Sequence, residues 1–187
     1  MHRARSCRSC PDDAAKKAQG ISIDSILSYP FSFVNPRSEL TTSQDTTRRV
    51  LFICTGNYYR SRFAEAVFNY HAERRQIPWT AFSRGLAIHL AEGYLSTYTT
   101  EALNTRQIHL RHTGPARASL SEKDLLESSY RIAMDRSEHL QMMLDQFPRW
   151  ADQIDYWDVS DIPFRSSSDA LPEIELKVMQ LLDKVSR

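Results

Sequence analysis

The segment "VLFICTGNYYRSRFAEAVFNY", which spans residues 50–70, decides the fold of this chain. Its first four residues are apolar and include β-branched side chains, which is typical of a strand buried on both faces of a parallel sheet. Residues 61–75 then carry apolar side chains at helical spacing, which predicts an amphipathic helix. A short loop joins the two elements, with Cys54 at its start and Arg60 at its end. The segment therefore predicts a strand–loop–helix unit with a cysteine at the carboxyl end of the strand.

The same alternation of strands and helices continues to the end of the chain. Further strands are predicted at residues 79–85, 130–135 and 155–159, and further helices at residues 96–106, 119–129, 136–147 and 170–185. Ser119 or Ser121 is expected to cap the second of these helices, and Asp135 to cap a helix or brace a loop. Alternation of this kind indicates a doubly wound α/β fold, in which helices cover both faces of a four-stranded parallel sheet in three layers, α/β/α. This domain is expected to span residues 48–187.

The size and charge of the chain limit what it can be. Its 187 residues, of which 41% are hydrophobic and 25% charged, suit one globular domain. A net charge of +1 gives no electrostatic reason to expect nucleic acid or an anionic membrane surface as a partner. No apolar run approaches the roughly 20 residues that cross a bilayer. We expect a soluble, cytoplasmic protein, in which residues 1–47 form a poorly ordered, polar N-terminal extension.

The cysteines and histidines do not form a recognisable metal motif. Cys7 and Cys10 make a C-x-x-C, but no second pair of ligands follows at zinc-finger spacing, and no strand precedes them. The histidines are scattered, without the i, i+4 pairing of a metal site. We therefore expect neither a metal nor another cofactor, and we interpret the C-x-x-C as incidental.

The loop between Cys54 and Arg60 has the composition of an anion-binding site. Backbone N–H groups of a short strand-to-helix loop can turn inward, and the helix dipole adds positive potential at the same place. Gly56 and Asn57 tolerate the positive φ that such a loop requires, and Arg60 offers a bidentate fork to two phosphate oxygens. The residues expected to bind phosphate are Thr55, Gly56, Asn57, Tyr58, Tyr59 and Ser61. No G-x-x-x-x-G-K-[ST] occurs, so this is not a nucleotide-binding P-loop.

Cys54 is expected to be the nucleophile of this site. The dipole and the guanidinium favour the charged thiolate form, which would attack phosphorus, and Ser61 could stabilise the thiolate by a hydrogen bond. The competing interpretation is an inert, buried cysteine near a helix cap, with Arg60 as an ordinary surface charge. The position of the motif between a buried strand and a helix favours the catalytic interpretation.

"VLFICTGNYYRSRFAEAVF" resembles the low-molecular-weight protein tyrosine phosphatase family, whose loop usually reads C-x-G-N-x-C-R-S-P before a helix that contains "AEA". Three further segments, "SRGL", "RIAMDRSEH" and "DVSDIPF", are similar to later landmarks of the family and occur in the same order. The resemblance covers the chain from about residue 48 to its end. It implies a phosphatase that works through a cysteinyl-phosphate and acts on a phosphorylated protein or a small phosphomonoester.

Such an enzyme also needs an acid to protonate the leaving oxygen. The resemblance implies an Asp just before a proline, which leaves Asp158 and Asp161 as candidates. Asp169 is taken as the residue before the last helix, and counting along the chain to that residue favours Asp161 as the acid. Ile162, however, separates Asp161 from Pro163. The expected catalytic residues are therefore Cys54, Arg60 and Asp161.

The chain departs from the family pattern at several positions. Tyr59 replaces the second loop cysteine, so protection of the nucleophile as a disulfide should be absent. Arg62 replaces the usual proline, and the aromatic pair that walls the substrate is reduced to Phe164. Tyr58 and Tyr59 are expected either to supply that wall or to narrow the pocket.

Two alternatives to a phosphatase follow from the same residues. Arsenate reductases share the fold and loop, but the resemblance implies two further cysteines, and none follows Cys54. A phosphate- or phosphoprotein-binding module that has lost efficient turnover would retain the loop, and the substitutions Tyr59 and Arg62 favour it. An intact Cys54 and Arg60 favour the enzyme.

Overall fold

The computed structural model describes residues 48–187. Four parallel strands of this part form one sheet: β1 (Arg48–Cys54), β2 (Trp79–Gly85), β3 (Tyr130–Ala133) and β4 (Asp155–Tyr156). The α-helices are α1 (Arg60–Arg74), α2 (Thr97–Thr105), α3 (Glu122–Glu127), α4 (Arg136–Gln146) and α5 (Ser167–Val185). The expectations for residues 1–47, including the C-x-x-C, lie outside the described residues.

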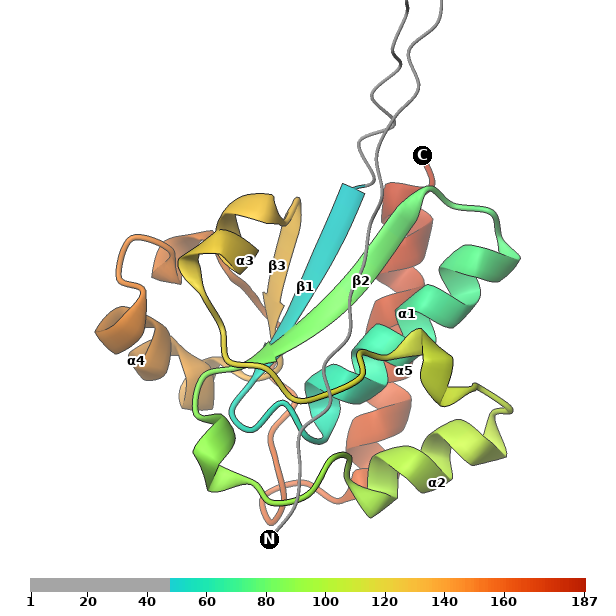
Figure 1. Ribbon diagram of the computed structural model, residues 1–187, viewed down its shortest axis with the longest axis horizontal. Helices are drawn as coiled ribbons and strands as arrows, with labels where there is room; N and C mark the ends of the chain where they lie inside the picture. The colour runs from blue at the N-terminus through green and yellow to red at the C-terminus, as the bar shows by residue number, and fades with distance from the viewer. Residues whose placement is uncertain (1–47) are drawn as a thin grey trace, which may run out of the picture. The chain divides into compact units, whose positions relative to one another are not determined.

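The order of the strands in the sheet is β2-β1-β3-β4. Figure 1 shows α1, α2 and α5 on one side of the sheet and α3 and α4 on the other, so the predicted three-layer, doubly wound α/β fold is confirmed. The chain moves outward from β1 to β2 and then returns to the other side of β1 to form β3. In open α/β sheets a crevice forms at such a reversal, outside the carboxyl ends of the strands. Here that place is the end of β1, at Cys54.

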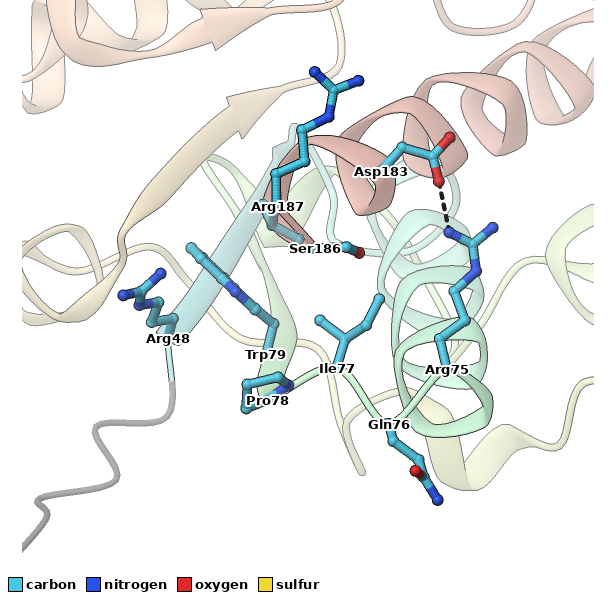
Figure 2. Close-up of a pocket in the computed structure, with 10 residues that line it drawn as sticks. Arg48, Arg75, Gln76, Ile77, Pro78, Trp79, Asp183, Ser186 and Arg187 are labelled. Atoms are coloured by element: carbon cyan, nitrogen blue, oxygen red, sulfur yellow. Dashed lines mark hydrogen bonds and ion pairs between the residues drawn. The ribbon is translucent and has the colours of Figure 1, made fainter.

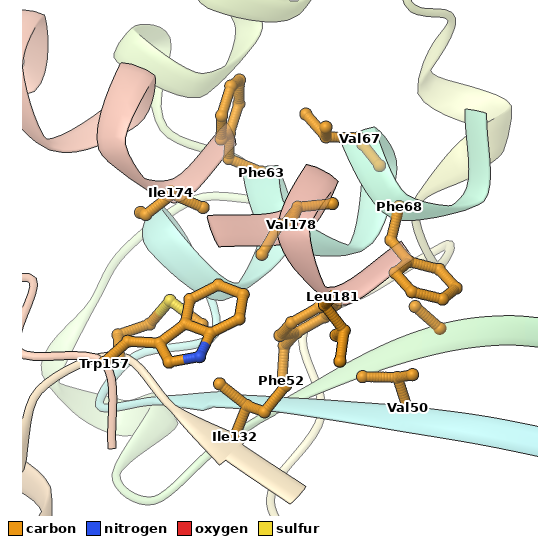
Figure 3. Close-up of a cluster of buried hydrophobic side chains, with 14 of the residues drawn as sticks. Val50, Phe52, Phe63, Val67, Phe68, Ile132, Trp157, Ile174, Val178 and Leu181 are labelled. Atoms are coloured by element: carbon orange, nitrogen blue, oxygen red, sulfur yellow. The ribbon is translucent and has the colours of Figure 1, made fainter. Parts of the chain in front are cut away.

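The larger part of the core lies between the sheet and the pair α1 and α5. Val50 and Phe52 of β1 point to this side and pack against apolar side chains of both helices (Figure 3). The Phe52 ring lies 6.2 Å from that of Phe68 and 5.5 Å from that of Trp157. Burying each such side chain contributes about 1.5–3 kcal/mol. This packing fixes β1 relative to α1 and so fixes both ends of the loop that joins them.

The other face of β1 forms a second, smaller core. Leu51 and Ile53 point to this side and pack with Leu125 of α3, Met143 of α4 and Trp150. Alternate residues of β1 therefore enter different cores, as the period of a strand requires. The continuous apolar run of the sequence is explained by this burial on both faces.

Helix α1 differs from the predicted amphipathic helix. From Arg60 through Phe68 every residue is buried, whichever way its side chain points. The polar residues of this half therefore cannot face water, and Arg60, Arg62 and Glu65 need partners within the protein. Only the second half, from Asn69, has an exposed side.

Several predicted boundaries were wrong by a few residues, and the helix predicted at residues 119–129 is the shorter α3, Glu122–Glu127. β3 and β4 end at Ala133 and Tyr156, earlier than predicted, although single hydrogen bonds continue the pairing, for example from Val159 N–H to the Met134 carbonyl at 2.7 Å. α5 begins at Ser167 rather than at residue 170, so Asp169 lies inside its first turn and not before it. The reason is that Ser166, in extended conformation, forms the N-cap position and donates from its hydroxyl to Asp169.

The capping predictions can also be compared with the structure. Ser121, and not Ser119, caps α3, and together with Asp124 it forms a reciprocal capping box. Asp135 caps α4 by accepting from the Glu138 N–H at 3.0 Å and also accepts from the Ser160 hydroxyl at 2.7 Å. The prediction that Asp135 caps a helix or braces a loop is thus confirmed in both senses. Among the described residues, no helix has the length and apolarity needed to cross a membrane.

Candidate active site

A cavity of about 920 Å³ lies at the amino-terminal ends of β1 and β2 (Figure 2). Arg48 and Trp79 line one side, and on the other side Arg75 donates to Asp183 at 2.7 Å. No cysteine is among its described lining residues. It also lies at the end of the sheet where α/β folds do not usually bind ligands. This cavity is therefore not the candidate active site.

A second cavity, of about 730 Å³, lies at the carboxyl ends of the strands and contains Cys54. Side chains from four separate parts of the chain meet there: the loop after β1, the region before and within α2, the start of α4 and the loop after β4. The lining residues are Cys54, Thr55, Gly56, Tyr58, Tyr59, Leu90, Ala91, Ser96, Tyr98, Ser137, Glu138, Ser160, Asp161, Ile162 and Phe164. The fold thus brings the predicted nucleophile and the predicted acid Asp161 to one cavity.

The loop is held tightly against the end of β2. Asn57 has φ of +47°, in the left-handed region, as predicted, but Gly56 does not have positive φ. Gly56 instead permits close approach, because a Cβ there would lie 2.8 Å from the Cβ of Ala91. Gly85 at the end of β2 does the same from the other side, since a Cβ there would lie 2.8 Å from the Thr55 carbonyl oxygen. The glycines therefore serve packing, and the asparagine supplies the turn.

Cys54 lies at the floor of the cavity and is 3% exposed. Its Sγ is 2.9 Å from the Ser61 Oγ, so the structure brings together the two groups that were predicted to interact. Asn57 Nδ2 donates to the same serine oxygen at 3.2 Å. A serine hydroxyl that already accepts one hydrogen bond retains its proton for the sulfur.

The Arg60 side chain is fully buried and held by three acceptors. Nη1 donates to the Val159 carbonyl at 2.9 Å, and Nη2 donates to Glu138 at 2.8 Å and to Asp161 at 2.6 Å. Burial alone would lower the pKa of Arg60, but the charges of Cys54, Glu138 and Asp161 raise it above its ordinary value. Nε has no hydrogen-bond partner among residues 48–187. A buried guanidinium N–H without an acceptor beside a cysteine is suited to binding an anion.

The two candidate acids differ in position. Asp161 lines the cavity, and its other carboxylate oxygen accepts from the Ile162 N–H at 2.8 Å. Asp158 is exposed, has φ of +56° and does not line the cavity. Of the two, only Asp161 contacts Arg60.

Glu138 is a site residue that the sequence analysis missed. It accepts from Arg60 and from the Thr55 hydroxyl, and it lies in the first turn of α4, directly after the Asp135 cap. Burial alone would raise the pKa of Glu138, but Arg60 and then His139 hold it below its usual range. The available signal was its position three residues after Asp135, which ends the third predicted strand at the same edge of the sheet as Cys54.

Aromatic residues form the walls of the cavity. Tyr58 and Tyr59 both line it, and the Tyr59 ring packs edge-on against Tyr98, with ring centroids 6.1 Å apart. Burial, reinforced by the negative charge of Asp161, raises the pKa of Tyr59 to about 12, so its hydroxyl remains protonated. Phe164 stands at the rim and is 89% exposed. The two loop tyrosines therefore contribute to the wall.

Arg62, which replaces the proline of the family pattern, has a structural position away from the cavity. Its guanidinium is buried and donates to the Gly114 carbonyl at 2.6 Å and the Ala116 carbonyl at 2.8 Å. It thereby ties the segment before α3 to the first turn of α1. No group of His, Cys, Asp or Glu residues within residues 48–187 is arranged to hold a metal ion.

Comparisons with known proteins agree with this geometry. The sequence model described as "Low molecular weight phosphotyrosine protein phosphatase" matches residues 49–187. The chain is 29% identical over 147 residues to a protein-arginine-phosphatase of Bacillus subtilis (strain 168), a match that covers 74% of this chain and 94% of that protein.

Solved structures show the same fold. A low molecular weight protein tyrosine phosphatase from T. tengcongensis superposes with a TM-score of 0.63 at 28% identity, covering 73% of this chain and 99% of that one. A YwlE mutant from Bacillus subtilis superposes with a TM-score of 0.63 at 27% identity, covering 75% and 99%. The family match spans nearly all of the described residues, including the loop with Cys54, so the chain is a cysteine-dependent phosphatase that belongs to the low molecular weight phosphotyrosine protein phosphatase family.

Proposed function

We propose that this phosphatase hydrolyses aryl phosphomonoesters, with phosphotyrosine in proteins as the substrate class, through a cysteinyl-phosphate on Cys54. The observation that carries the proposal is the unpaired Nε of buried Arg60, the first residue of α1, directly after the loop that begins at Cys54. Arg60 lies behind the residues that line the cavity and contacts two of them, Glu138 and Asp161. An anion at the floor of the cavity would supply the missing acceptor. Its phosphorus would then lie next to the sulfur.

In the first step the Cys54 thiolate attacks phosphorus, and the bond to the leaving oxygen breaks. Loop N–H groups and Arg60 stabilise the charge on the phosphoryl oxygens. When a phosphate oxygen takes the place of the Asp161 carboxylate on Arg60 Nη2, Asp161 is released toward the leaving oxygen. Freed from the guanidinium, Asp161 takes up a proton from solvent, and this carboxyl proton then passes to the leaving oxygen, which departs as a neutral phenol.

In the second step water attacks the phosphoryl group on Cys54, and the P–S bond breaks. Asp161, now ionised, accepts a proton from the water, and inorganic phosphate leaves. The Ser61 hydroxyl, 2.9 Å from the sulfur, stabilises the departing thiolate. The proton taken from water leaves Asp161 protonated, and the sulfur departs as the thiolate, so both groups are restored for the next turnover.

The cavity wall supports an aromatic substrate. Tyr58, Tyr59 and Tyr98 surround the cavity, and Leu90 and Phe164 extend its apolar surface to the rim. A phenyl ring above the phosphate would be buried against these side chains. Offset or edge-on aromatic contacts contribute about 0.5–1.5 kcal/mol beyond the area that they bury.

Phosphoarginine is the second candidate substrate. The relative from Bacillus subtilis is named a protein-arginine-phosphatase. In addition, the side chains of Glu138 and Asp161, 30% and 38% exposed, could accept hydrogen bonds from a substrate guanidinium. The aromatic wall favours the aryl ester, and the two carboxylates favour the guanidine.

The deciding experiment compares two peptides of one sequence that carry phosphotyrosine or phosphoarginine at the same position. We expect kcat/KM to be higher for phosphotyrosine, and a preference for phosphoarginine would overturn the substrate class. Cys54→Ser is the control, and it should abolish phosphate release from both peptides. Phosphate binding by the wild type without turnover of either peptide would instead support the binding-module alternative.

A cytoplasmic location stays a prediction.

A further inference from the structure

Arg117, in the segment before α3, does not line the cavity, but its side chain donates to the carbonyl of Ala91, which does. We propose that Arg117 is a positioning residue for substrate specificity. It holds residues 86–96, the loop between β2 and α2, which form one side of the cavity mouth and are called the rim loop below. The role rests on the proposed hydrolysis of aryl phosphomonoesters, and it adds a residue that sets the affinity for a protein substrate.

Backbone hydrogen bonds fix the two ends of the rim loop to the catalytic loop, residues 54–59. The Leu86 N–H donates to the Cys54 carbonyl at 3.0 Å, and at the other end the Ser96 N–H donates to the Tyr58 carbonyl, also at 3.0 Å. Within the part of the chain that the structure describes, the middle of the rim loop forms backbone hydrogen bonds only with the rim loop itself. Its position therefore depends on side-chain contacts.

Two side chains tie the middle of the rim loop to the segment before α3. Arg117 Nη1 donates to the carbonyls of Ile88 and Ala91, both at 2.6 Å. From the rim loop, the Tyr94 hydroxyl donates to the Gly114 carbonyl at 2.8 Å. Hydrogen bonds from an ionised donor are stronger than those between neutral groups, so Arg117 provides the larger share of this attachment.

The segment that carries Arg117 is itself fixed by Arg62 of α1. The buried Arg62 guanidinium donates to the carbonyls of Gly114 and Ala116, at 2.6 and 2.8 Å. It also lies 5.1 Å from the centre of the Tyr94 ring, and a guanidinium within about 6 Å of a ring centre is attracted to it. Arg62 thus connects α1 to both attachments of the rim loop. A proline at this position would have no side-chain donor for them.

The rim loop contributes Leu90 and Ala91 to the lining of the cavity. Ala91 lies directly against the catalytic loop, since a Cβ on Gly56 would be 2.8 Å from the Ala91 Cβ. Leu90 is 68% exposed, and two exposed apolar residues of the loop after β4, Ile162 and Phe164, line the same cavity. Exposed apolar side chains that gather beside a polar site mark a surface for binding.

The depth of the cavity separates the roles of its floor and its mouth. A phosphate group at the floor would contact the catalytic loop, whereas the residues that flank a phosphotyrosine in a protein would reach the mouth and contact Leu90. When Arg117 no longer holds the rim loop, the surface for these flanking residues is lost, and the floor with Cys54 is unchanged. The affinity for a phosphorylated protein should therefore fall, while the chemistry on Cys54 is retained.

The test compares Arg117→Met, which keeps an unbranched stem but removes the donors, with Arg117→Lys, which keeps a charged donor. The substrates are p-nitrophenyl phosphate and a peptide in which apolar residues flank phosphotyrosine. For Arg117→Met we expect kcat/KM for the peptide to fall about tenfold relative to p-nitrophenyl phosphate, the size of one or two lost side-chain contacts. The loss should lie in KM and not in kcat, as for a contact made equally in the ground and transition states. Arg117→Lys should recover part of it.

Two further variants separate the rim loop from general effects on the fold. Tyr94→Phe removes only the second attachment and should raise the peptide KM in the same direction. Arg131→Met is the matched control, because Arg131 Nε also donates to a backbone carbonyl, that of Leu125 at 2.7 Å, but away from the cavity. It should leave the ratio between the two substrates unchanged. If Arg117→Met does not fold, as judged by circular dichroism, Tyr94→Phe decides the matter.

An unchanged peptide KM in Arg117→Met would overturn the proposal, and so would an equal loss for both substrates or the same selective loss in Arg131→Met. Peptide binding to the Cys54→Ser forms of these proteins, measured by fluorescence polarisation, does not require turnover. A wild type that hydrolyses neither substrate, together with weaker peptide binding when Arg117 is replaced, would contradict the proposed function and leave the role of Arg117 intact. Hydrolysis of both substrates with equal peptide affinity in all forms would contradict the role of Arg117 alone.

Discussion

Replacing Gly85 with alanine tests how the fold positions the catalytic loop. A Cβ at this position would lie 2.7 Å from Ile88 Cγ2, 2.8 Å from the Thr55 carbonyl oxygen and 2.9 Å from the Asn57 nitrogen. Two of these three atoms belong to the backbone of the loop that starts at Cys54. The loop must therefore move by several tenths of an ångström to accommodate one methyl group.

Gly114 provides the matched control, because a Cβ there would lie 3.5 Å from Arg62 Nη1 and from Glu65 Oε1, which is ordinary contact. Either Gly→Ala change restricts the unfolded chain and should stabilise the protein by about 0.4–1 kcal/mol. Only Gly85→Ala also overpacks the structure, which typically costs about 1–3 kcal/mol. The free energy of unfolding of Gly85→Ala should therefore be about 1–3 kcal/mol below that of Gly114→Ala.

Activity should follow the displacement of the loop. A misplacement of about 1 Å can reduce a rate about 100-fold, so we expect a loss of roughly tenfold in kcat/KM for Gly85→Ala and little change for Gly114→Ala. Urea unfolding and hydrolysis of p-nitrophenyl phosphate measure the two effects. If the two variants have equal stability and activity, close packing of the loop on β2 does not position the nucleophile.

The remaining predictions concern the charged groups of the site. Asp161→Asn should slow the hydrolysis of phenyl phosphate more than that of p-nitrophenyl phosphate, because a poor leaving group depends most on its proton. The expected loss is about 10²–10⁴-fold, the range that general acids contribute. The control is Asp158→Asn, and leaving-group dependence in that variant instead would reassign the acid. Glu138→Gln removes a negative charge that is paired with Arg60 and would compete with a bound anion. Inorganic phosphate should therefore inhibit more strongly, with a binding free energy more favourable by on the order of 1 kcal/mol. Weaker inhibition would mean that Glu138 positions Arg60 for the anion. Burial alone would raise the pKa of Asp135, but hydrogen bonds from Ser137, Ser160 and the Glu138 N–H lower it. The stabilisation from Asp135 should therefore be complete above about pH 4 and be lost as the pH falls through the lower folded pKa. Urea unfolding should show that Asp135→Asn loses less stability than the wild type over that pH range. The same dependence of the free energy of unfolding on pH in both proteins would refute this role of Asp135.

The strands and helices were predictable because their signals are local. A run of apolar residues at 50–53 indicates burial on both faces, and the serines at 119 and 121 indicate a helix cap, although only the structure shows that Ser121 supplies it. The two-residue strand β4 was overestimated because its length depends on pairing with β3, which the sequence does not display. The start of α5 was placed too late for a similar reason, since the role of Ser166 depends on its extended backbone.

The site was only partly predictable. Cys54, Arg60 and Asp161 were identified because a motif and the carboxyl edge of the sheet bring them together, and their catalytic roles stay predictions. Glu138 was missed because a glutamate in the first turn of a helix resembles a solvated charge. The burial of Glu65 was likewise not predicted, because its hydrogen-bond partners Ser83, Thr113 and Gly114 lie 18, 48 and 49 positions further along the chain and become its neighbours only in the folded protein.

The most direct test of the central claim is to trap the covalent intermediate. The enzyme would be mixed with p-nitrophenyl phosphate, quenched in acid on the millisecond timescale, and the Cys54 peptide analysed by mass spectrometry. We predict one phosphoryl group on Cys54 during turnover, which disappears when the substrate is exhausted. Steady release of p-nitrophenol with Cys54 unmodified at every time point, and with activity preserved in Cys54→Ser, would contradict the account.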